Sequence, residues 1–347
     1  MRRTLFASAL SLLLLLAQGV SANAQSAGGT SPSGARTSGA QGATPVARVN
    51  VPLPASDAVL RADLKRLLTE VVPRALAADQ ARLARVNADV EQFKARTGID
   101  ARAFDTVTVG ARIERLPSGA TKIGNAVAIA RGTFSTDALV SAMRVAAKGS
   151  LAEQKYAGQT LYVFPINDRI KVFGLARMHV GELAVCVLDR STLAVGEPAA
   201  VRGAIDAAAG RGHVEQSLVN SVQTSSGLVA FAGNVPAGAF AGMETGLPNV
   251  DRAVASIRAF YGSLAQTPAG FTLTTVLRAQ TSADARQLYD TAQALKQVGP
   301  GLISLSGEKG KFAQAALSNL KLSTKGEEVQ LQLDVAQGDI AELLRAL

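Results

Sequence analysis

Residues 106–114 read Thr-Val-Thr-Val-Gly-Ala-Arg-Ile-Glu, and a second alternation of apolar with other residues follows at 123–129. Successive side chains of a strand point to opposite faces, so each pattern predicts a half-buried strand. The Pro-Ser-Gly sequence at 117–119 predicts the turn that joins the two strands into an antiparallel hairpin. Apolar residues then recur at helical spacing between 139 and 147, which predicts a helix and hence an α+β fold.

Further apolar runs predict more strands and a closing helix. The runs lie at 161–164, 170–175, 183–188 and 192–195. Pro198 suits a first helical turn and Gly210 suits a helix end, so these two residues bracket the closing helix.

The same order of elements recurs in the second half of the chain. The pattern Arg-x-x-x-Ser-x-Asp-Ala occurs at 131–138 and again, 147 residues later, at 278–285. Each copy lies where an apolar strand meets a helix. A hairpin that turns at 325–326 follows the second copy, and a helix is predicted to begin near Asp339. We therefore predict a tandem duplication of a β-β-α-β-β-α unit, with antiparallel or mixed sheets in each half.

Two serines hold the same place in the two copies of this pattern. Ser135 and Ser282 each precede a predicted helix, where a hydroxyl accepts hydrogen bonds from the free amides of the first turn. Asp137 and Asp284 follow them and complement the helix dipole. We interpret both serines as N-caps rather than as nucleophiles.

The N-terminal residues carry a predicted export signal. Arg2 and Arg3 precede an apolar run, and the small residues at 22–24 match the cleavage site of a secretory signal peptide. The run is shorter than the roughly 20 residues that a membrane span needs. Residues 1–24 are therefore predicted to be a signal peptide, with a retained anchor as the alternative. The Gly-, Ser- and Pro-rich residues 25–54 are predicted to be a flexible tether in a protein exported to the periplasm or beyond.

A pair of helices is predicted between the tether and the first hairpin. Apolar residues recur at helical spacing at 60–72, after Ser56 as N-cap, and again at 76–93. Pro73 is expected to separate the two helices. Two α+β halves, residues 55–213 and 214–347, complete the predicted domain organisation.

The charge of the chain is unevenly placed. The sequence has 36 Lys and Arg against 27 Asp and Glu, a formal charge of +9. Residues 61–213 hold 22 basic and 15 acidic residues, whereas residues 214–347 hold 10 and 11. Any long-range attraction to anionic lipid or acidic polysaccharide therefore belongs to the first half. No arginine-rich run with aromatic residues accompanies the charge, so we predict no nucleic-acid binding.

Signatures of catalysis and of cofactor binding are missing from the sequence. There is no Gly-x-Ser-x-Gly elbow, no phosphate-binding loop and no Gly-x-Gly-x-x-Gly fingerprint. The two histidines, His179 and His213, have no His or Cys nearby in the sequence, and the single cysteine, Cys186, lies in a run typical of a buried strand. We predict no metal, no cofactor and no enzymatic activity.

One partial match to a catalytic motif remains. Ser306 with Lys309 and Ser318 with Lys321 both match Ser-x-x-Lys, in which lysine can take the serine proton in penicillin-recognising enzymes. The Ser-x-Asn and Lys-Thr-Gly motifs of those enzymes are missing from the sequence. A serine hydrolase is therefore an alternative, and it requires a buried lysine beside its serine.

Several segments resemble exported bacterial proteins of the acidobacterial type. They are residues 104–112, 124–134, 192–206 and 316–321, and the resemblance covers roughly residues 55–347. It implies export and the duplicated α+β build, and it implies no activity, cofactor or site residue.

Taken together, these patterns favour a non-catalytic binding or interaction module of the bacterial envelope. Its partner would be an envelope protein, an anionic lipid or a polysaccharide. A carrier of a small apolar ligand between the two halves is a further alternative, and it predicts a large cavity lined by aliphatic side chains.

Overall fold

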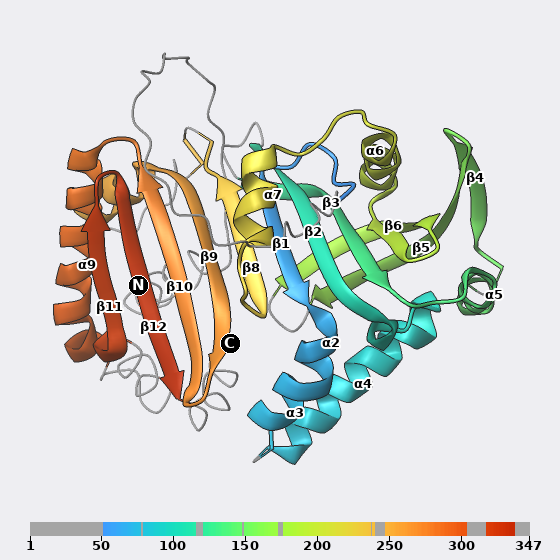
Figure 1. Cartoon of the computed structure of the whole chain (residues 1–347), viewed down its shortest axis with the longest axis horizontal. Coiled ribbons are helices and arrows are strands. Elements are labelled where there is room, and N and C mark those ends of the chain that lie inside the picture. Colours follow the sequence, from blue (N-terminus) through green and yellow to red (C-terminus); the bar gives the residue numbers. More distant parts are fainter. Residues whose placement is uncertain are drawn as a thin grey trace, which may run out of the picture.

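Antiparallel strands form the centre of the fold in the computed structural model, which describes residues 51–77, 79–115, 121–147, 149–172, 176–236, 238–239, 247–303 and 317–336. The strands are β1 (Ala58–Asp63), β2 (Phe104–Arg115), β3 (Thr121–Gly132), β4 (Ala152–Tyr156), β5 (Gln159–Val172), β6 (Ala176–Asp189), β7 (Thr192–Gly196), β8 (Val229–Asn234), β9 (Ile257–Thr267), β10 (Gly270–Ala279), β11 (Leu320–Lys325) and β12 (Glu328–Ala336). They make one twelve-stranded sheet in the order β11-β12-β10-β9-β8-β1-β2-β3-β7-β6-β5-β4 (Figure 1). The predicted α+β class is confirmed, with antiparallel pairing between the strands.

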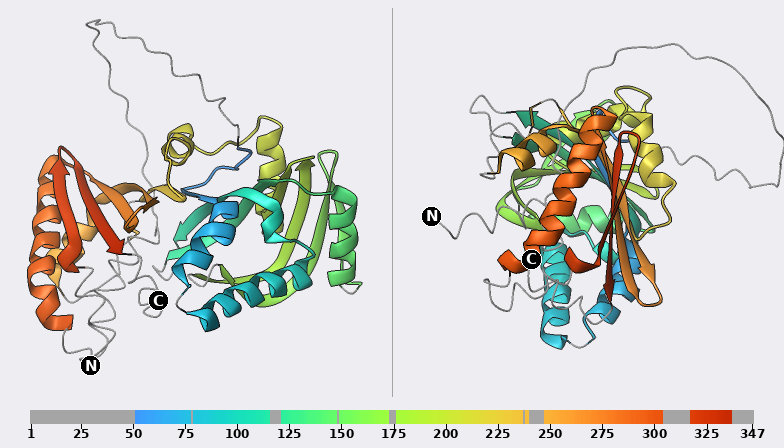
Figure 2. Two further views of the ribbon diagram at one scale, coloured as in Figure 1. Left: turned by 60° about the horizontal axis from the view of Figure 1, so that its bottom comes forward. Right: turned by 90° about the vertical axis from the view of Figure 1, so that its left-hand side faces the viewer.

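Helices lie on both faces of this sheet (Figure 2). They are α2 (Leu64–Arg66), the π-helical turn η1 (Leu67–Val71), α3 (Val72–Ala75), α4 (Gln80–Thr97), the 3₁₀ turn η2 (Ala101–Ala103), α5 (Thr136–Ala146), α6 (Pro198–Ala208), α7 (Gln216–Gln223), α8 (Pro248–Ala255) and α9 (Ser282–Ile303). Side chains of α6 and α7 pack in one core cluster, whereas those of α5 and of α8 with α9 pack in clusters on the opposite side. We call these two sides of the sheet the α6 face and the α9 face.

Strand β1 joins the two halves of the sheet. It pairs with β2 along one edge and with β8 along the other, so Leu60 lies opposite Val109 and Phe231. The prediction of a helix over residues 60–72 is therefore wrong for residues 60–63, which belong to β1. The Ser56 hydroxyl donates to the carbonyl of Pro54 at 2.8 Å and does not cap a helix. The segment forms a strand because it pairs with a neighbouring strand along each edge and buries Val59 and Ala62. These tertiary contacts outweigh the local helix propensity.

Helical structure continues from Leu64 to Ala75, through the position where a break was expected. Pro73 lacks an amide and clashes with the carbonyl four residues earlier in a regular α-helix. The π-helical turn η1 widens the helix just before Pro73, and α3 follows directly. The second predicted helix is confirmed as α4, which ends at Gly98 in the left-handed conformation with φ 73°.

The described residues begin within the predicted tether. Leu53 is fully buried in the core cluster under α6 and α7. The amide of Val214 donates to the Leu53 carbonyl at 3.1 Å, and Pro54 forms an isolated bridge with His213. Residues 51–54 therefore belong to the first half rather than to the tether, while residues 1–50 lie outside the described residues.

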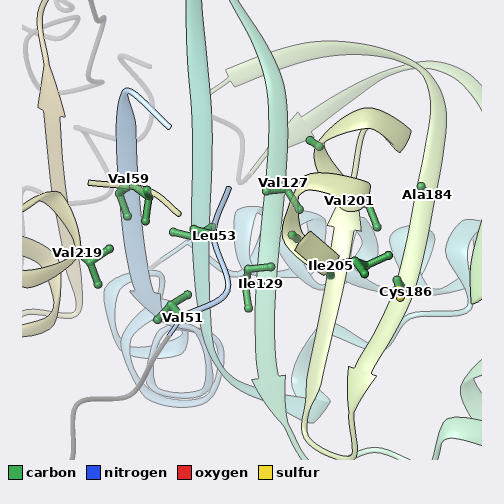
Figure 3. Packing of buried hydrophobic residues seen from close by; sticks show 14 of the residues in the cluster. Val51, Leu53, Val59, Val127, Ile129, Ala184, Cys186, Val201, Ile205 and Val219 are labelled. Carbon is green, nitrogen blue, oxygen red and sulfur yellow. The ribbon is translucent and has the colours of Figure 1, made fainter. Parts of the chain in front are cut away.

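The core under α6 is aliphatic and closely packed. Figure 3 shows Val201 and Ile205 of α6 beside Val127 and Ile129 of β3, and Cys186 lies in the same cluster. Cys186 is fully buried and forms no disulfide, which confirms its predicted place in a buried strand. Burial raises the pKa of its thiol to about 11, so the side chain stays neutral at physiological pH.

Candidate functional site

The α6 face is buried and apolar in the centre of the sheet and exposed and polar at the β11 end. One row of paired residues crosses the whole sheet on this face: Ala152, Val163, Ala184, Gly196, Val127, Gly110, Val59, Ala232, Tyr261, Val276, Gln330 and Ser323. Val127, Val59 and Ala232 in the centre are buried, whereas Gln330 and Ser323 at the β12 and β11 end are exposed. The cover of helices therefore ends between β8 and the outer strands.

We call the α6-face side chains of β9, β10, β11 and β12 the open face. Its members are Tyr261, Ser263, Ala265, Thr272, Thr274, Val276, Arg278, Lys321, Ser323, Lys325, Glu328, Gln330, Gln332 and Asp334. Only Val276 among them is buried. The right-hand view of Figure 2 shows α9 on one side of these strands and α7 on the other. Helix α7 lies over β8 and β1, so no described helix covers β10, β11 and β12 on this side.

Sequence alternation produces the open face. Val329, Leu331, Leu333 and Val335 of β12 alternate with Glu328, Gln330, Gln332 and Asp334. The four apolar residues pack in clusters with side chains of the α9 face. An antiparallel sheet can bury one face and leave the other in water, and these strands have the composition for that arrangement.

One cluster on the open face joins three strands. Arg278 of β10 donates from Nε and Nη2 to Oε1 of Glu328 on β12, at 3.1 and 2.7 Å. The hydroxyl of Tyr261 on β9 donates to the other oxygen of Glu328 at 3.2 Å. Burial, followed by the charge of Glu328, raises the pKa of Tyr261, so its hydroxyl remains a hydrogen-bond donor.

A second cluster surrounds Asp334. Lys321 Nζ lies 2.8 Å from one carboxylate oxygen, and the Thr272 hydroxyl donates to the other at 2.7 Å. The amide of Gln332 lies 3.3 and 3.4 Å from the same two oxygens. These hydrogen bonds, the one from Lys321 foremost, lower the pKa of Asp334 to about 2, so it stays ionised.

Of the two Ser-x-x-Lys candidates, one lies within the described residues and the other lies outside them. Ser306 and Lys309 lie outside the described residues. Ser318 is exposed, and the Lys321 side chain is 69% exposed and bonded to Asp334. A lysine that acts as a base needs a desolvated setting to lose its proton at neutral pH. Lys321 lacks that setting, so the geometry gives the hydrolase hypothesis no support at this pair.

The two repeated serines differ in the structure. Ser135 caps α5, because its Oγ accepts from the amide of Ala138 at 3.4 Å. Ser282 is instead the first residue of α9, and Thr281 accepts from the amide of Asp284 at 3.1 Å. The capping interpretation holds for Ser135 and is wrong for Ser282, because a threonine one residue earlier takes the position.

The histidines and the possible metal ligands form no metal-binding cluster within the described ranges. His213 is exposed beside Pro54, and His179 lies on β6. Across the residues that the structure describes, no three His, Cys, Asp or Glu side chains are grouped so that they could hold a metal ion. Within the same ranges, no helix combines the length and the apolar character that a membrane crossing demands.

Comparison with known proteins leaves the family open. No protein-family profile matches the chain, and no curated protein sequence matches it. Two solved structures are similar in fold, crystal forms III and I of TP0453, at 10% and 11% sequence identity. They cover 86% and 87% of this chain and 98% of the TP0453 chain, with TM-scores of 0.47 and 0.43.

The open face presents polar groups and charges that are mostly paired, with one cation, Lys325, in excess. Each cation of its two clusters, Arg278 and Lys321, is paired with a carboxylate. Strand spacing and rise give the four strands a surface of about 600 Å². This area is somewhat below the roughly 800 Å² that each partner contributes to a standard protein interface. The open face is therefore large enough to form much of one side of a protein contact.

Proposed function

We propose that the protein is an exported, non-catalytic interaction module of the bacterial envelope, and that the open face binds an envelope protein. The observation that carries the proposal is the exposure of the organised polar clusters of β9 to β12, on the same face that α6 covers in the first half. The signal peptide expected at 1–24 and residues 25–50 of the tether expected at 25–54 support export to the envelope.

The chemistry of the open face favours a protein over the other envelope partners. Its three cations, Arg278, Lys321 and Lys325, exceed its two carboxylates by one, which gives only a weak attraction to an anionic lipid surface, and the basic excess of the chain lies in residues 61–213. Tyr261 is its only aromatic residue, so a polysaccharide would find little surface for stacking. Alternating donors and acceptors on rigid strands match the polar rim of a protein interface.

We also infer that the two halves arose by tandem duplication. The strand order β2-β3-β7-β6 in the first half corresponds to β9-β10-β12-β11 in the second. Arg131 and Arg278 occupy the same position of the repeated pattern, and each lies near a carboxylate of the hairpin beyond its helix, Asp189 and Glu328. Among the described residues, helices α6 and α7 cover this face from β6 to β8 and no helix covers it over β10, β11 and β12, which supports a separate role for the second half.

The proposal is tested by affinity capture from the native envelope with the tagged mature protein, residues 25–347. Mass spectrometry identifies the retained proteins and small molecules. Gln330→Arg places a long charged side chain in the middle of the open face, and Asn87→Arg makes the same charge change on the exposed surface of α4. We expect a protein that wild type and Asn87→Arg retain and that Gln330→Arg loses.

Two outcomes contradict the proposal. Equal retention of the partner by both variants would place the contact elsewhere on the molecule. Retention of a lipid or metabolite alone would favour the carrier alternative instead.

A further inference from the structure

A groove of about 900 Å³ lies on the α9 face, between the start of α8 and one side of α9. It is lined by Leu247, Pro248, Asn249, Val250, Ser282, Ala283, Arg286, Gln287, Asp290, Thr291, Ala294 and Leu295. Half of these residues are polar, and the groove lies within the second half of the chain. It therefore differs from the aliphatic cavity between the halves that the carrier alternative requires.

The lining residues of α9 form two parallel rows along the helix. One row is Ser282, Arg286, Asp290 and Ala294, and the other is Ala283, Gln287, Thr291 and Leu295. Each row repeats every four residues and runs for about 18 Å along the helix axis. Rows of this kind are the ridges between which the side chains of a second helix insert.

Two charges in the groove lack partners among the described residues, unlike Arg278 and Lys321 of the open face. Arg286 and Asp290 lie one turn apart on the same row, and neither forms a hydrogen bond or ion pair within the described part of the chain. By contrast, Arg278 and Arg258 of the neighbouring strands are both hydrogen-bonded. The rim adds an apolar contact, because Leu247 is a large side chain that remains 49% exposed.

We infer that the groove binds an amphipathic α-helix of a partner protein. Its apolar side chains would contact Leu247 and Leu295, an acidic residue would pair with Arg286, and a basic residue one turn away would pair with Asp290. The two parallel rows favour a helix as the occupant, because the side chains of a second helix insert between such rows. The order of Arg286 and Asp290 along the row favours a helix that carries an acidic and a basic residue one turn apart. This surface lies on the opposite side of the sheet from the open face, so the inference goes beyond the proposed function.

The test begins with selection of helical peptides by the mature protein. A phage library of random peptides of about 15 residues is panned against residues 25–347, and the selected peptides are synthesised for fluorescence anisotropy. We expect enrichment of amphipathic sequences with an acid and a base three or four positions apart. Arg286→Glu combined with Asp290→Lys should weaken binding about tenfold, since each contact becomes repulsive.

A charge-exchanged peptide and a variant of α4 complete the experiment. The peptide with its acid and base exchanged should regain affinity for the Arg286→Glu, Asp290→Lys protein. Asn87→Arg on the exposed surface of α4 serves as the control and should bind the original peptide as wild type does. Selection of no helical peptide overturns the inference. Binding that is insensitive to the double substitution also overturns it.

Discussion

Two substitutions at corresponding positions, Val127→Thr and Thr274→Val, test whether helices cover the α6 face in the first half and leave it open in the second. The quantity compared is the change in the free energy of unfolding. Val127 of β3 and Thr274 of β10 hold the same position of the repeated unit, four residues before Arg131 and Arg278. Val127 is 1% exposed under α6, so Val127→Thr removes a buried methyl group, worth about 0.8 kcal/mol. It also buries a hydroxyl, at a cost of about 1–3 kcal/mol. We expect the free energy of unfolding to fall by about 2–4 kcal/mol.

Thr274→Val on the open face should change the free energy of unfolding by less than about 0.5 kcal/mol. Thr274 is only partly buried, and valine is at least as favourable as threonine in a strand. Urea unfolding followed by circular dichroism measures both variants, and equal slopes show that the unfolded states are comparable. A difference between the two variants of less than about 1 kcal/mol would refute the argument that helices cover the first half and leave the second half open.

Three further predictions concern single side chains. Ser135→Ala should lower the free energy of unfolding by about 1 kcal/mol, because the α5 cap is lost. Ser282→Ala should change the free energy of unfolding by less than about 0.5 kcal/mol. Equal losses of stability in thermal unfolding would contradict this difference. Cys186 in the folded protein should resist a thiol reagent, and because its pKa is raised from 9.0 to about 11, it should contribute a fall in stability as the pH rises through that interval; Cys186→Ala should make the fall smaller, and an unchanged pH profile would argue against the thiol as a source. The pKa of Tyr261 is raised as well, so part of the fall should remain. The pKa of Asp334 is lowered from 3.8 to about 2, and the stability that this contributes is lost as the pH falls through that interval. Because Lys321 is the main cause of the lowered pKa, Lys321→Ala should raise it in a carboxyl NMR titration. An unchanged pKa would show that the pair does not form in solution.

Local patterns predicted much of the first half. The hairpin of β2 and β3, the helix α5 and the hairpin of β6 and β7 all follow from alternation, caps and turn residues that act within a few positions. The hairpin of β11 and β12 turns at Gly326, which has φ 61°, as its glycine indicates. These elements could be predicted because their signals are local.

Strand β1 could not be predicted in this way. Leu60 and Leu64 are spaced as on a helix, but Leu64 is buried at the start of α2 while Leu60 remains 39% exposed on the strand. The pairing of β1 with both β2 and β8 is a long-range property, and it converts two expected half-sheets into one. Propensity is a weak signal beside such tertiary pairing.

The open face was missed for a related reason. The sequence shows that Gln330, Gln332 and Asp334 alternate with apolar residues, but it does not show which strands lie beside β12. Tyr261, Arg278 and Glu328 come from three strands up to 67 positions apart, and only the sheet order brings them together. Polar alternation identifies an exposed face, whereas the composition of a site on that face depends on long-range pairing.

Photocrosslinking at the centre of the open face tests the central claim most directly. A photoreactive amino acid is introduced at Gln330, and in a separate variant at Asn87 on exposed α4, in protein exported to its native envelope. We predict that illumination yields a discrete covalent adduct with one envelope protein from position 330 and none from position 87. No protein adduct from position 330, or the same adduct from both positions, would contradict the assignment of the open face as the binding surface.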